Sequence, residues 1–310
     1  AVSNHFHRRF RILLDVNGYK DNKYSRLIKI ARKCGVPVVA TFHSQFKEDM
    51  KEYVKLKLLS KIVLKYIVNF YKKCDEVWAV SEAAARMLRS YGFKKEIKIM
   101  TNGVDFTYPK NIEETKEKVA KEYGFDFNKK NIFYIGQIRK AKNVKLILET
   151  LRELNKKRQD FHMFFAGTGA FLKKAIKLSK KWKIDDKVTF LGVIKDKEIL
   201  ASLLSSSDVF FFPSTYDTFS LVVREANVCK VPVLLVKGSG AADGFVDGKN
   251  GYLEEEDAKL LSNKLEYIFD HKEEAIKCAE EATSVPKRWN ELIPEVSKEY
   301  DLLINKYKNK

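Results

Sequence analysis

Apolar and polar positions alternate in two different ways along the second half of the chain. Short runs that are almost wholly apolar stand at 131–136, 161–166, 188–191, 208–212 and 231–236. Between them, stretches such as 144–154 and 196–206 carry apolar residues at the spacing of one helix face. Continuous apolar strands that alternate with helices are typical of a parallel sheet covered on both faces. We therefore predict a doubly wound α/β domain in this half.

The first 110 residues repeat this design in part. The pattern predicts strands at 10–16, 36–41, 76–80 and 97–100, and helices at 24–33, 46–73 and 81–91, the last with Ser81 as N-cap. Turn residues at 101–109 separate the two halves. At the other end, 286–310 forms an amphipathic helix long enough to reach back across a domain interface. We predict a first Rossmann-like domain over 1–108, a second over 109–285, and a crossing helix over 286–310.

The segment 210–226 changes from a strand pattern to a helix pattern. An apolar run that ends at Phe212 is followed by a polar loop and by an apolar helix start near Phe219. Asp217 and Glu225 place two carboxylates eight positions apart across this change. Ligands of open parallel sheets bind outside the carboxyl ends of strands, where helix N-termini offer free N–H groups to anions. The segment therefore predicts a site for a phosphate-bearing ligand.

Composition narrows the class of protein. With 310 residues and 45% hydrophobic residues, the chain can form about two globular domains. Its four cysteines stand far apart, without the spacing of a zinc site or a disulfide framework. No signal peptide opens the sequence, and no apolar run reaches the roughly 20 residues of a membrane span. These features predict a cytoplasmic protein with reduced thiols and no metal site.

The formal net charge of +18 is the other large feature of the composition. It predicts attraction to a polyanion: an anionic lipid surface, nucleic acid or a phosphorylated substrate. The alternative is a solvated, lysine-rich surface without a specific partner. The sequence contains no recognisable nucleic-acid reader motif, so we expect no nucleic-acid partner.

A series of motifs runs from about Val36 to Tyr300. In chain order they are Thr41-Phe42-His43, Val80-Ser81, Asn102 to Asp105, Ile135-Gly136 with Lys142-Asn143, Gly167-Thr168-Gly169, Val188 to Gly192, Asp208 to Ser214, Asp217 with Glu225-Ala226, Val231-Pro232-Val233 and Asp247 to Gly251. In this order and spacing the chain resembles the retaining nucleotide-sugar glycosyltransferases of family 4. The resemblance implies the GT-B fold, which has two Rossmann-like domains with mostly parallel sheets.

The resemblance also implies a role for each matching residue. His43 would face the donor sugar from the first domain, Lys142 would neutralise the leaving diphosphate, and Asp217 would hold the hydroxyls of the donor sugar. The donor-binding set is Gly136, Gln137, Arg139, Gly167, Val193, Phe219, Ser220, Leu221 and Glu225. In this set the N–H groups at Phe219–Leu221 would receive the diphosphate, the backbone at Val193 would read the base, and Glu225 would accept both ribose hydroxyls.

Each assignment has a structural alternative. Taken alone, Glu225 would be a solvated helix residue, Asp217 a helix N-cap and Lys142 one surface lysine among many. His43 would be a core histidine, and Gly167-Thr168-Gly169 a simple turn between a strand and a helix.

The implied chemistry is hexosyl transfer from a nucleoside diphosphate sugar, with UDP as the expected nucleotide. Lys142 and the helix-start amides would stabilise the charge that develops on the leaving oxygen. The acceptor hydroxyl would attack from the same face, and the leaving phosphate would take its proton. This mechanism requires neither a carboxylate nucleophile pair nor a metal or other cofactor. The expected acceptors are lipid-linked or polysaccharide hydroxyls, as in the synthesis of glycolipids and cell-surface polysaccharides.

The sequence departs from the family pattern at several positions. Gln137 replaces a phosphate-binding arginine, for which Arg139 can compensate, and Asp217 replaces a glutamate, which shortens the reach by about 1.5 Å. Lys230 replaces a glycine, and Asp243 stands where a glutamate often follows. Only about 35 residues precede Val36, which implies a truncated or reduced first domain.

The predicted helix 46–73 mixes lysines with large apolar residues, a composition that suits an anionic membrane surface. We therefore expect a cytoplasmic enzyme, and the second option is a peripheral protein at the inner face of the cell membrane. The alternative for the helix is core packing with a solvated lysine face. The alternative for the whole chain is a catalytically silent nucleotide-sugar-binding or scaffold subunit of a glycan-assembly system. A basic nucleic-acid-binding protein is the third hypothesis, and it depends on the net charge alone.

Overall fold

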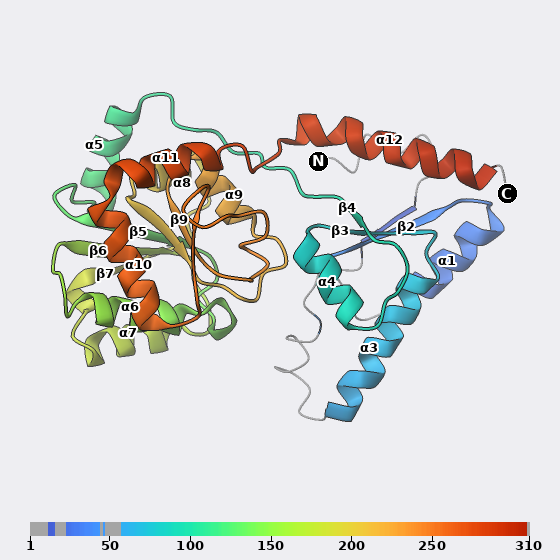
Figure 1. The fold of residues 1–310 in the computed structure, drawn as a ribbon, viewed down its shortest axis with the longest axis horizontal. Helices are drawn as coiled ribbons and strands as arrows, with labels where there is room; N and C mark the ends of the chain where they lie inside the picture. Colours follow the sequence, from blue (N-terminus) through green and yellow to red (C-terminus); the bar gives the residue numbers. More distant parts are fainter. Residues whose placement is uncertain (1–11, 16–22, 44–45, 47–56, 309–310) are drawn as a thin grey trace. The chain divides into compact units, whose positions relative to one another are not determined.

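The computed structural model of the chain describes residues 12–15, 23–43, 46 and 57–308. Its contacts divide the chain into two compact units (Figure 1). The first unit runs to Asn102 and includes the C-terminal segment from Trp289, and the second unit is Gly103–Arg288. Each unit contains its own parallel sheet with helical connections.

The first unit is a four-stranded sheet in the order β1-β2-β3-β4. Its elements are β1 (Ile12–Asp15), α1 (Lys23–Lys33), β2 (Val38–Phe42), α3 (Lys57–Lys72), β3 (Glu76–Ala79), α4 (Glu82–Ser90) and β4 (Lys98–Ile99). All neighbouring strands are parallel. The predicted N-cap of α4 is confirmed, because the Ser81 side chain accepts a hydrogen bond from the Ala84 amide at 3.0 Å. The parts of the predicted strand 10–16 and helix 46–73 at 10–11, 16 and 47–56 lie outside the described residues.

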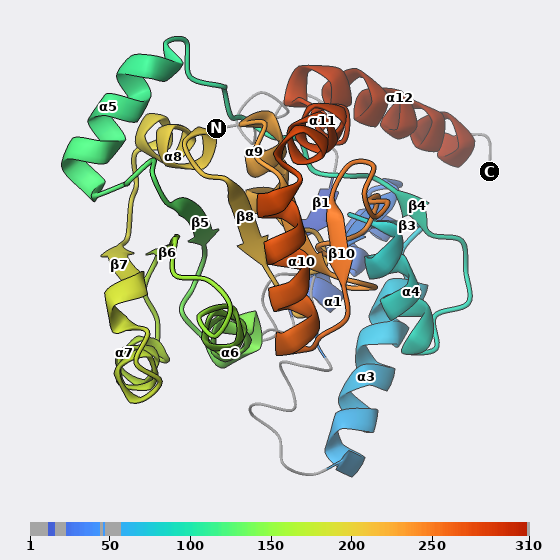
Figure 2. The same ribbon diagram turned by 60° about the vertical axis from the view of Figure 1, so that its left-hand side comes forward.

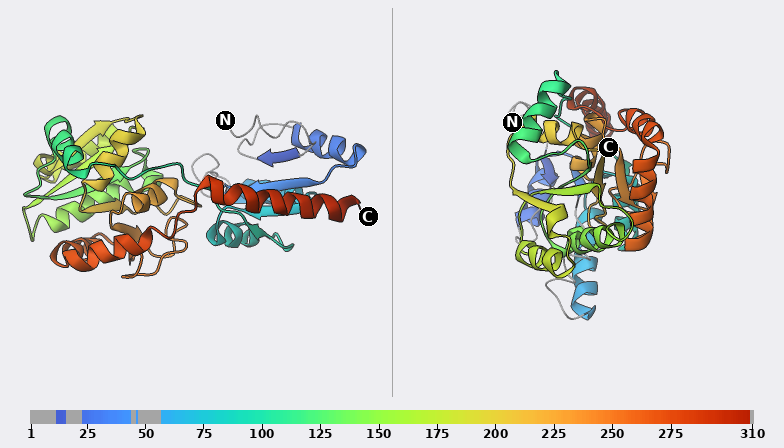
Figure 3. Two further views of the ribbon diagram at one scale, coloured as in Figure 1. Left: turned by 90° about the horizontal axis from the view of Figure 1, so that it is seen from above. Right: turned by 90° about the vertical axis from the view of Figure 1, so that its left-hand side faces the viewer.

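The C-terminal helix α12 (Trp289–Lys308) packs on the sheet of this first unit (Figure 3). The rings of Trp78 and Tyr300 stack with their centroids 5.0 Å apart, and Leu303 is buried beside them. The Lys98 ammonium donates to Glu76 at 3.0 Å and to Glu299 at 2.6 Å. Aromatic stacking and charge-assisted hydrogen bonds therefore join the end of the chain to strands near its beginning.

The second unit has a six-stranded parallel sheet in the order β10-β9-β8-β5-β6-β7. Its strands are β5 (Lys130–Ile135), β6 (Phe161–Ala166), β7 (Val188–Gly192), β8 (Val209–Phe212), β9 (Val233–Val236) and β10 (Tyr252–Glu254). The chain adds β6 and β7 on one side of β5, and then returns to add β8, β9 and β10 on the other side. The strand order therefore reverses between β5 and β8.

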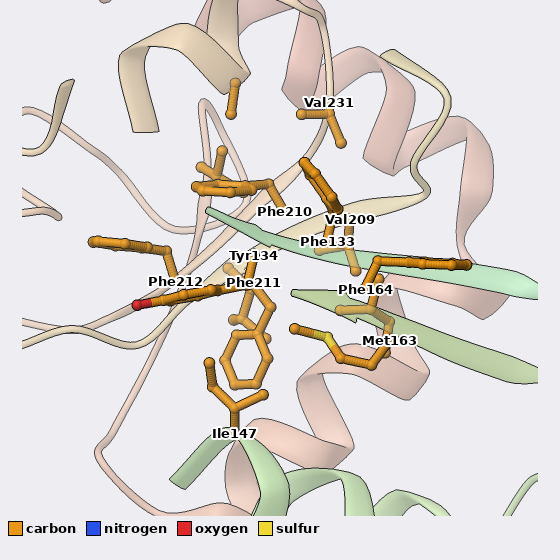
Figure 4. Packing of buried hydrophobic residues seen from close by; sticks show 14 of the residues in the cluster. Phe133, Tyr134, Ile147, Met163, Phe164, Val209, Phe210, Phe211, Phe212 and Val231 are labelled. Atoms are coloured by element: carbon orange, nitrogen blue, oxygen red, sulfur yellow. The ribbon is translucent and has the colours of Figure 1, made fainter. Parts of the chain in front are cut away.

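Helices cover both faces of this sheet, as the sequence pattern predicts. They are α5 (Ile112–Tyr123), α6 (Val144–Leu154), α7 (Leu172–Lys181), α8 (Lys197–Ser205), α9 (Leu221–Val228), α10 (Ala258–Asp270) and α11 (Lys272–Ala282), with short 3₁₀ turns η2 (Lys140–Lys142) and η3 (Asp185–Lys187). α6, α7 and α10 lie on one face, and α5, α8 and α9 lie on the other (Figure 2). Phe133, Phe164 and Phe210–Phe212 fill the core between the layers (Figure 4).

Two differences from the sequence-based expectation concern this unit. β10, α10 and α11 were not predicted, since β10 is only a three-residue strand and gives no strong alternation. The helix expected to start near Phe219 begins at Leu221, because Ser220 has the extended backbone of an N-cap (φ −88°, ψ 108°). The Phe219 and Ser220 amides therefore precede the helix rather than form its first turn.

The backbone at Lys230 would suit glycine better than lysine. Lys230 follows α9 in a left-handed conformation, with φ 54°. That conformation costs an ordinary residue roughly 1–2 kcal/mol, whereas glycine adopts it freely.

We expect Lys230→Gly to raise the free energy of unfolding by up to about 1 kcal/mol, because the relief of backbone strain exceeds the extra entropy that glycine gives the unfolded chain. Urea unfolding would measure this change. The control is Lys118→Gly, at an exposed position inside α5, which should lose about 1 kcal/mol. Equal losses in the two variants would contradict the strain argument.

Candidate functional site

The reversal of strand order between β5 and β8 determines where the candidate site lies. Adjacent parallel strands whose connections leave in opposite directions open a crevice outside their carboxyl ends. The loop after β5 spans 136–143, and the loop after β8 spans 213–220. Lys142 and Asp217, both predicted as site residues, lie on these two loops.

The structure brings Lys142 and Asp217 into direct contact. The Lys142 ammonium donates to one Asp217 carboxylate oxygen at 2.5 Å, and the Ser214 hydroxyl donates to the other at 2.5 Å. The ammonium also lies 5.8 Å from the centroid of the Phe212 ring and 5.5 Å from that of Tyr216. With side chains only 16% and 18% exposed, the pair is shielded enough for its attraction to exceed that of a surface ion pair.

Asn143 connects the two loops beside this ion pair, and sequence reasoning assigned it no role. It has a left-handed backbone, with φ 56°, at the start of α6. Its side-chain amide donates to the Pro213 carbonyl at 2.9 Å and to the Glu256 carboxylate at 2.7 Å. The hydrogen bond to Pro213 therefore ties the loop after β8 to Asn143, the residue next to Lys142.

A second group of predicted residues lines one pocket of about 570 Å³, which lies on the β6 and β7 side of the point where the strand order reverses. Its lining includes five residues of the predicted donor-binding set: Gly136, Gln137, Arg139, Gly167 and Val193. Ile135, Ala166, Ile194 and Leu200 give much of the remaining wall an apolar character. A mostly apolar pocket with a few polar groups suits a small organic ligand.

Close backbone packing accounts for the glycines around this pocket. A Cβ on Gly167 would lie 2.0 Å from the Gly136 carbonyl oxygen, and one on Gly169 would lie 2.6 Å from the Ile138 carbonyl oxygen. The Gly167 amide donates to the Gly192 carbonyl at 2.6 Å. The loops after β5 and β6 and the end of β7 therefore contact one another through their backbones, and at Gly167 and Gly169 only glycine permits this contact.

The positive charge at this pocket comes from Arg139. Its guanidinium donates to the Gln137 side-chain oxygen at 3.4 Å, and both residues line the pocket. The Gln137 carbonyl accepts a hydrogen bond from the buried Tyr134 hydroxyl at 3.0 Å, and burial raises the pKa of that hydroxyl. Arg139 thus lies beside Gln137, the position at which the resemblance implies an arginine.

Glu225 lies on α9, the helix that follows the Asp217 loop. Burial raises the pKa of its carboxyl above the ordinary value, and the charge of Lys197 partly opposes this shift. At the start of the same helix, the Ser220 side chain forms no cap hydrogen bond, so it does not occupy the amides of the first turn. These features suit the binding of hydroxyls at Glu225 and of an anion near Leu221.

His43 is the predicted site residue that belongs to the first unit. It is half-buried and follows directly after β2. The other predicted site residues all belong to the second unit.

Comparison with known proteins gives two family matches and a set of relatives. Residues 5–108 match the model Glycosyltransferase Family 4, and residues 115–285 match Glycosyl transferases group 1. The alpha-monoglucosyldiacylglycerol synthase of Streptococcus pneumoniae is 26% identical over 211 residues, which are 67% of this chain and 48% of that protein. The processive diacylglycerol alpha-glucosyltransferase of Acholeplasma laidlawii is 22% identical over 68% of this chain and 63% of its own. This chain thus spans roughly half to two thirds of these relatives.

Solved structures share the fold at low sequence identity. HepE of Anabaena, solved with UDP and glucose, superposes with a TM-score of 0.78 over 93% of this chain and 77% of its own, at 17% identity. Sucrose-phosphate synthase of Thermosynechococcus elongatus gives a TM-score of 0.75 over 91% of this chain and 71% of its own, at 19% identity. The two Rossmann-like units accordingly have the GT-B fold. Because the group 1 model covers more than half of its residues, this chain belongs to the group 1 glycosyl transferases.

Proposed function

We propose that the second unit binds a nucleoside diphosphate sugar and that the protein transfers the hexose, with retention, to a lipid-linked hydroxyl. The observation that carries this proposal is the Lys142–Asp217 pair at the strand-order reversal. One loop holds both Lys142 and the pocket residues Gly136 and Arg139, so a ligand in the pocket can extend toward the pair.

We assign a group of residues to each part of the donor. The pocket at Gly136 and Val193 receives the base, and the half-buried Glu225 carboxylate accepts the ribose hydroxyls. The diphosphate lies at the start of α9, and the sugar hydroxyls reach Asp217. In this arrangement Lys142 exchanges its contact with Asp217 for a contact with the leaving phosphate.

The reaction then depends on charge stabilisation. As the bond between the sugar and the diphosphate breaks, negative charge develops on the leaving oxygen, and Lys142 with nearby amides stabilises it. The leaving phosphate takes the proton of the attacking hydroxyl on the same face of the sugar. We infer that these protein groups supply the positive charge without a divalent cation.

The choice of donor and acceptor follows the named relatives. HepE was solved with UDP, one relative is named as an alpha-monoglucosyldiacylglycerol synthase, and another is named as a processive diacylglycerol alpha-glucosyltransferase. We therefore propose a UDP-hexose donor and a diacylglycerol-type acceptor. An acceptor that lies in a membrane requires the protein to work at the membrane surface.

Helix α3 offers a surface for that purpose. None of the described helices is long and apolar enough to span a membrane. On α3, Ile62 and Tyr66 are both 58% exposed and lie one turn apart, next to exposed Lys61 and Lys65. The opposite side of the helix, with Ile67 among others, is buried. Exposed apolar residues flanked by lysines suit the interface of an anionic membrane. We propose that α3 binds this surface, and that the protein is a peripheral protein of the cytoplasmic face.

Glu225→Gln tests donor binding and has a second, independent readout. Loss of charged hydrogen bonds to ribose should weaken UDP binding roughly ten- to a hundredfold, measured by calorimetry at pH 7. Without ligand, the same change should stabilise the fold at pH 7. A carboxyl whose pKa is raised on folding destabilises the folded state above its unfolded-state pKa, near 4.5, and the penalty disappears below that value.

The control for this test is Glu153→Gln. Hydrogen bonds from Lys156 and Arg152 lower the pKa of Glu153, so its replacement should reduce stability at pH 7 and leave UDP binding unchanged. Urea unfolding at pH 7 and pH 4 separates the two signs. Unchanged UDP affinity in Glu225→Gln would argue against the assigned ribose contact, and absence of UDP binding by the unaltered protein would argue against the proposed donor.

Lys142→Met tests catalysis. We expect kcat to fall about 10²- to 10³-fold in a release assay with UDP-glucose and diacylglycerol in mixed micelles, because the leaving charge loses its cation. Lys145→Met is the control, since Lys145 lies three residues away but pairs with Glu149 on the surface of α6. If the unaltered protein binds UDP-glucose but turns over no acceptor, the silent-subunit alternative replaces this proposal.

Paired neutral substitutions test the membrane surface. Each lysine near an anionic surface contributes about 1 kcal/mol, so Lys61→Gln with Lys65→Gln should weaken binding to phosphatidylglycerol vesicles roughly thirtyfold. The control pair is Lys173→Gln with Lys177→Gln on α7, where both lysines are also exposed. Sedimentation with vesicles measures the binding, and equal losses in the two pairs would show only a general effect of net charge.

A further inference from the structure

Arg224 is a buried arginine on α9 that the proposed chemistry does not use. Only 3% of it is exposed, and its guanidinium lies over two aromatic rings, 4.5 Å from the centroid of Phe219 and 5.0 Å from that of Phe245. It donates to the Ala241 carbonyl at 2.7 Å and to the Asp243 carbonyl at 2.6 Å. Burial lowers the pKa of Arg224 to about 10, so the group remains a cation at neutral pH.

The two carbonyls belong to the loop that follows β9, and this loop packs on the Asp217 segment. A Cβ on Gly240 would lie 2.1 Å from the Asp217 carbonyl oxygen and 3.0 Å from the Thr218 Cα. Gly240 and the Asp217–Thr218 backbone are therefore in direct contact, with no space for a side chain. The loop therefore contacts both Arg224 and the segment that carries the Asp217 carboxylate.

Gly251 makes room for the second ring of this arrangement. A Cβ on Gly251 would lie 2.6 Å from the Phe245 ring, so the absence of a side chain lets that ring occupy its place beside Arg224. The other ring, Phe219, belongs to the short segment between Asp217 and α9. Arg224 thus contacts both sides of the junction: the loop after β9 through carbonyls, and the segment before α9 through a ring.

We propose that Arg224 is a positioning residue, which fixes the Asp217 carboxylate by holding the 238–244 loop against the Asp217–Thr218 backbone. The guanidinium is suited to this role because its planar fork donates to two carbonyls while it also lies over two aromatic rings, a combination that lysine does not offer. Glu225, the next residue on the same helix, has a different proposed role, because its carboxylate is assigned to the ribose hydroxyls of the ligand. The assigned sugar contact of Asp217 depends on the proposed function, whereas the mechanical coupling does not.

Hydrogen–deuterium exchange of the ligand-free protein tests this coupling. In Arg224→Met, we expect amides of 238–245 and also those of 214–221 to exchange at least tenfold faster. The matched control is Arg158→Met: Arg158 also lies over a ring, that of Phe269 at 5.2 Å, and donates to Asp160 and Asp270. That control should leave 214–221 unchanged. Faster exchange confined to 238–245 in Arg224→Met would overturn the proposal.

Two further variants keep the test decisive if Arg224→Met does not fold. Gly240→Ala retains Arg224 but forces the loop away from the Asp217 carbonyl, so it should also accelerate exchange at 214–221. Arg224→Lys retains the charge and should give an intermediate effect in the same two segments. Unchanged exchange at 214–221 in Gly240→Ala and Arg224→Lys overturns the coupling.

Enzyme kinetics add a readout that a purely structural role would not change. With UDP-glucose as donor, Arg224→Lys should lower kcat at least tenfold while the affinity for UDP alone changes less than threefold, because the base and ribose contacts remain. Equal losses of UDP and UDP-glucose affinity would overturn a specific effect on the sugar end. If the unaltered protein binds no nucleotide sugar, the proposed function fails, and the exchange experiment still decides the coupling.

Discussion

The pairing of β5 with β8 is the constraint on which the candidate site depends. It places side by side two strands whose connections leave in opposite directions, so the loops after β5 and β8 meet outside the carboxyl ends of these strands. Lys142 and Asp217 stand 75 residues apart in the sequence and meet at 2.5 Å because of this pairing. A different strand order would leave each of these charged groups without its partner in a half-buried place.

The loops around the candidate site are also constrained, because glycines let their backbones come into direct contact. The backbone of Gly167 packs on Gly136, and that of Gly240 packs on Asp217, in both cases where a side chain would collide with a carbonyl. Contacts of this kind transmit position well, because backbone atoms have fewer alternative arrangements than long side chains. The loops at the carboxyl ends of the second sheet are therefore packed against one another through their backbones. Arg139, Lys142 and Asp217 belong to these loops.

The sequence predicted the parts of this arrangement that leave a local or family-wide pattern. Apolar runs identified five of the six strands of the second sheet, and motif spacing identified Lys142, Asp217 and five of the residues that line the pocket. Asn143 and Arg224 escaped assignment because their roles depend on carbonyl groups of distant loops, which no periodicity reveals. An arginine among apolar neighbours in 221–228 was the available signal for Arg224.

The Lys142–Asp217 pair also bears on the substitution of aspartate for the usual glutamate. A glutamate would carry its carboxylate about 1.5 Å farther into the crevice. The shorter side chain instead stays where Ser214 and Lys142 both reach it, so the two charges compensate each other before a ligand arrives. A diphosphate sugar brings a negative group for the lysine and hydroxyl donors for the carboxylate, so both can exchange partners without either charge becoming unpaired. Such an exchange avoids the large cost of an isolated half-buried charge, and it requires that the Asp217 segment be held firmly while its partner leaves.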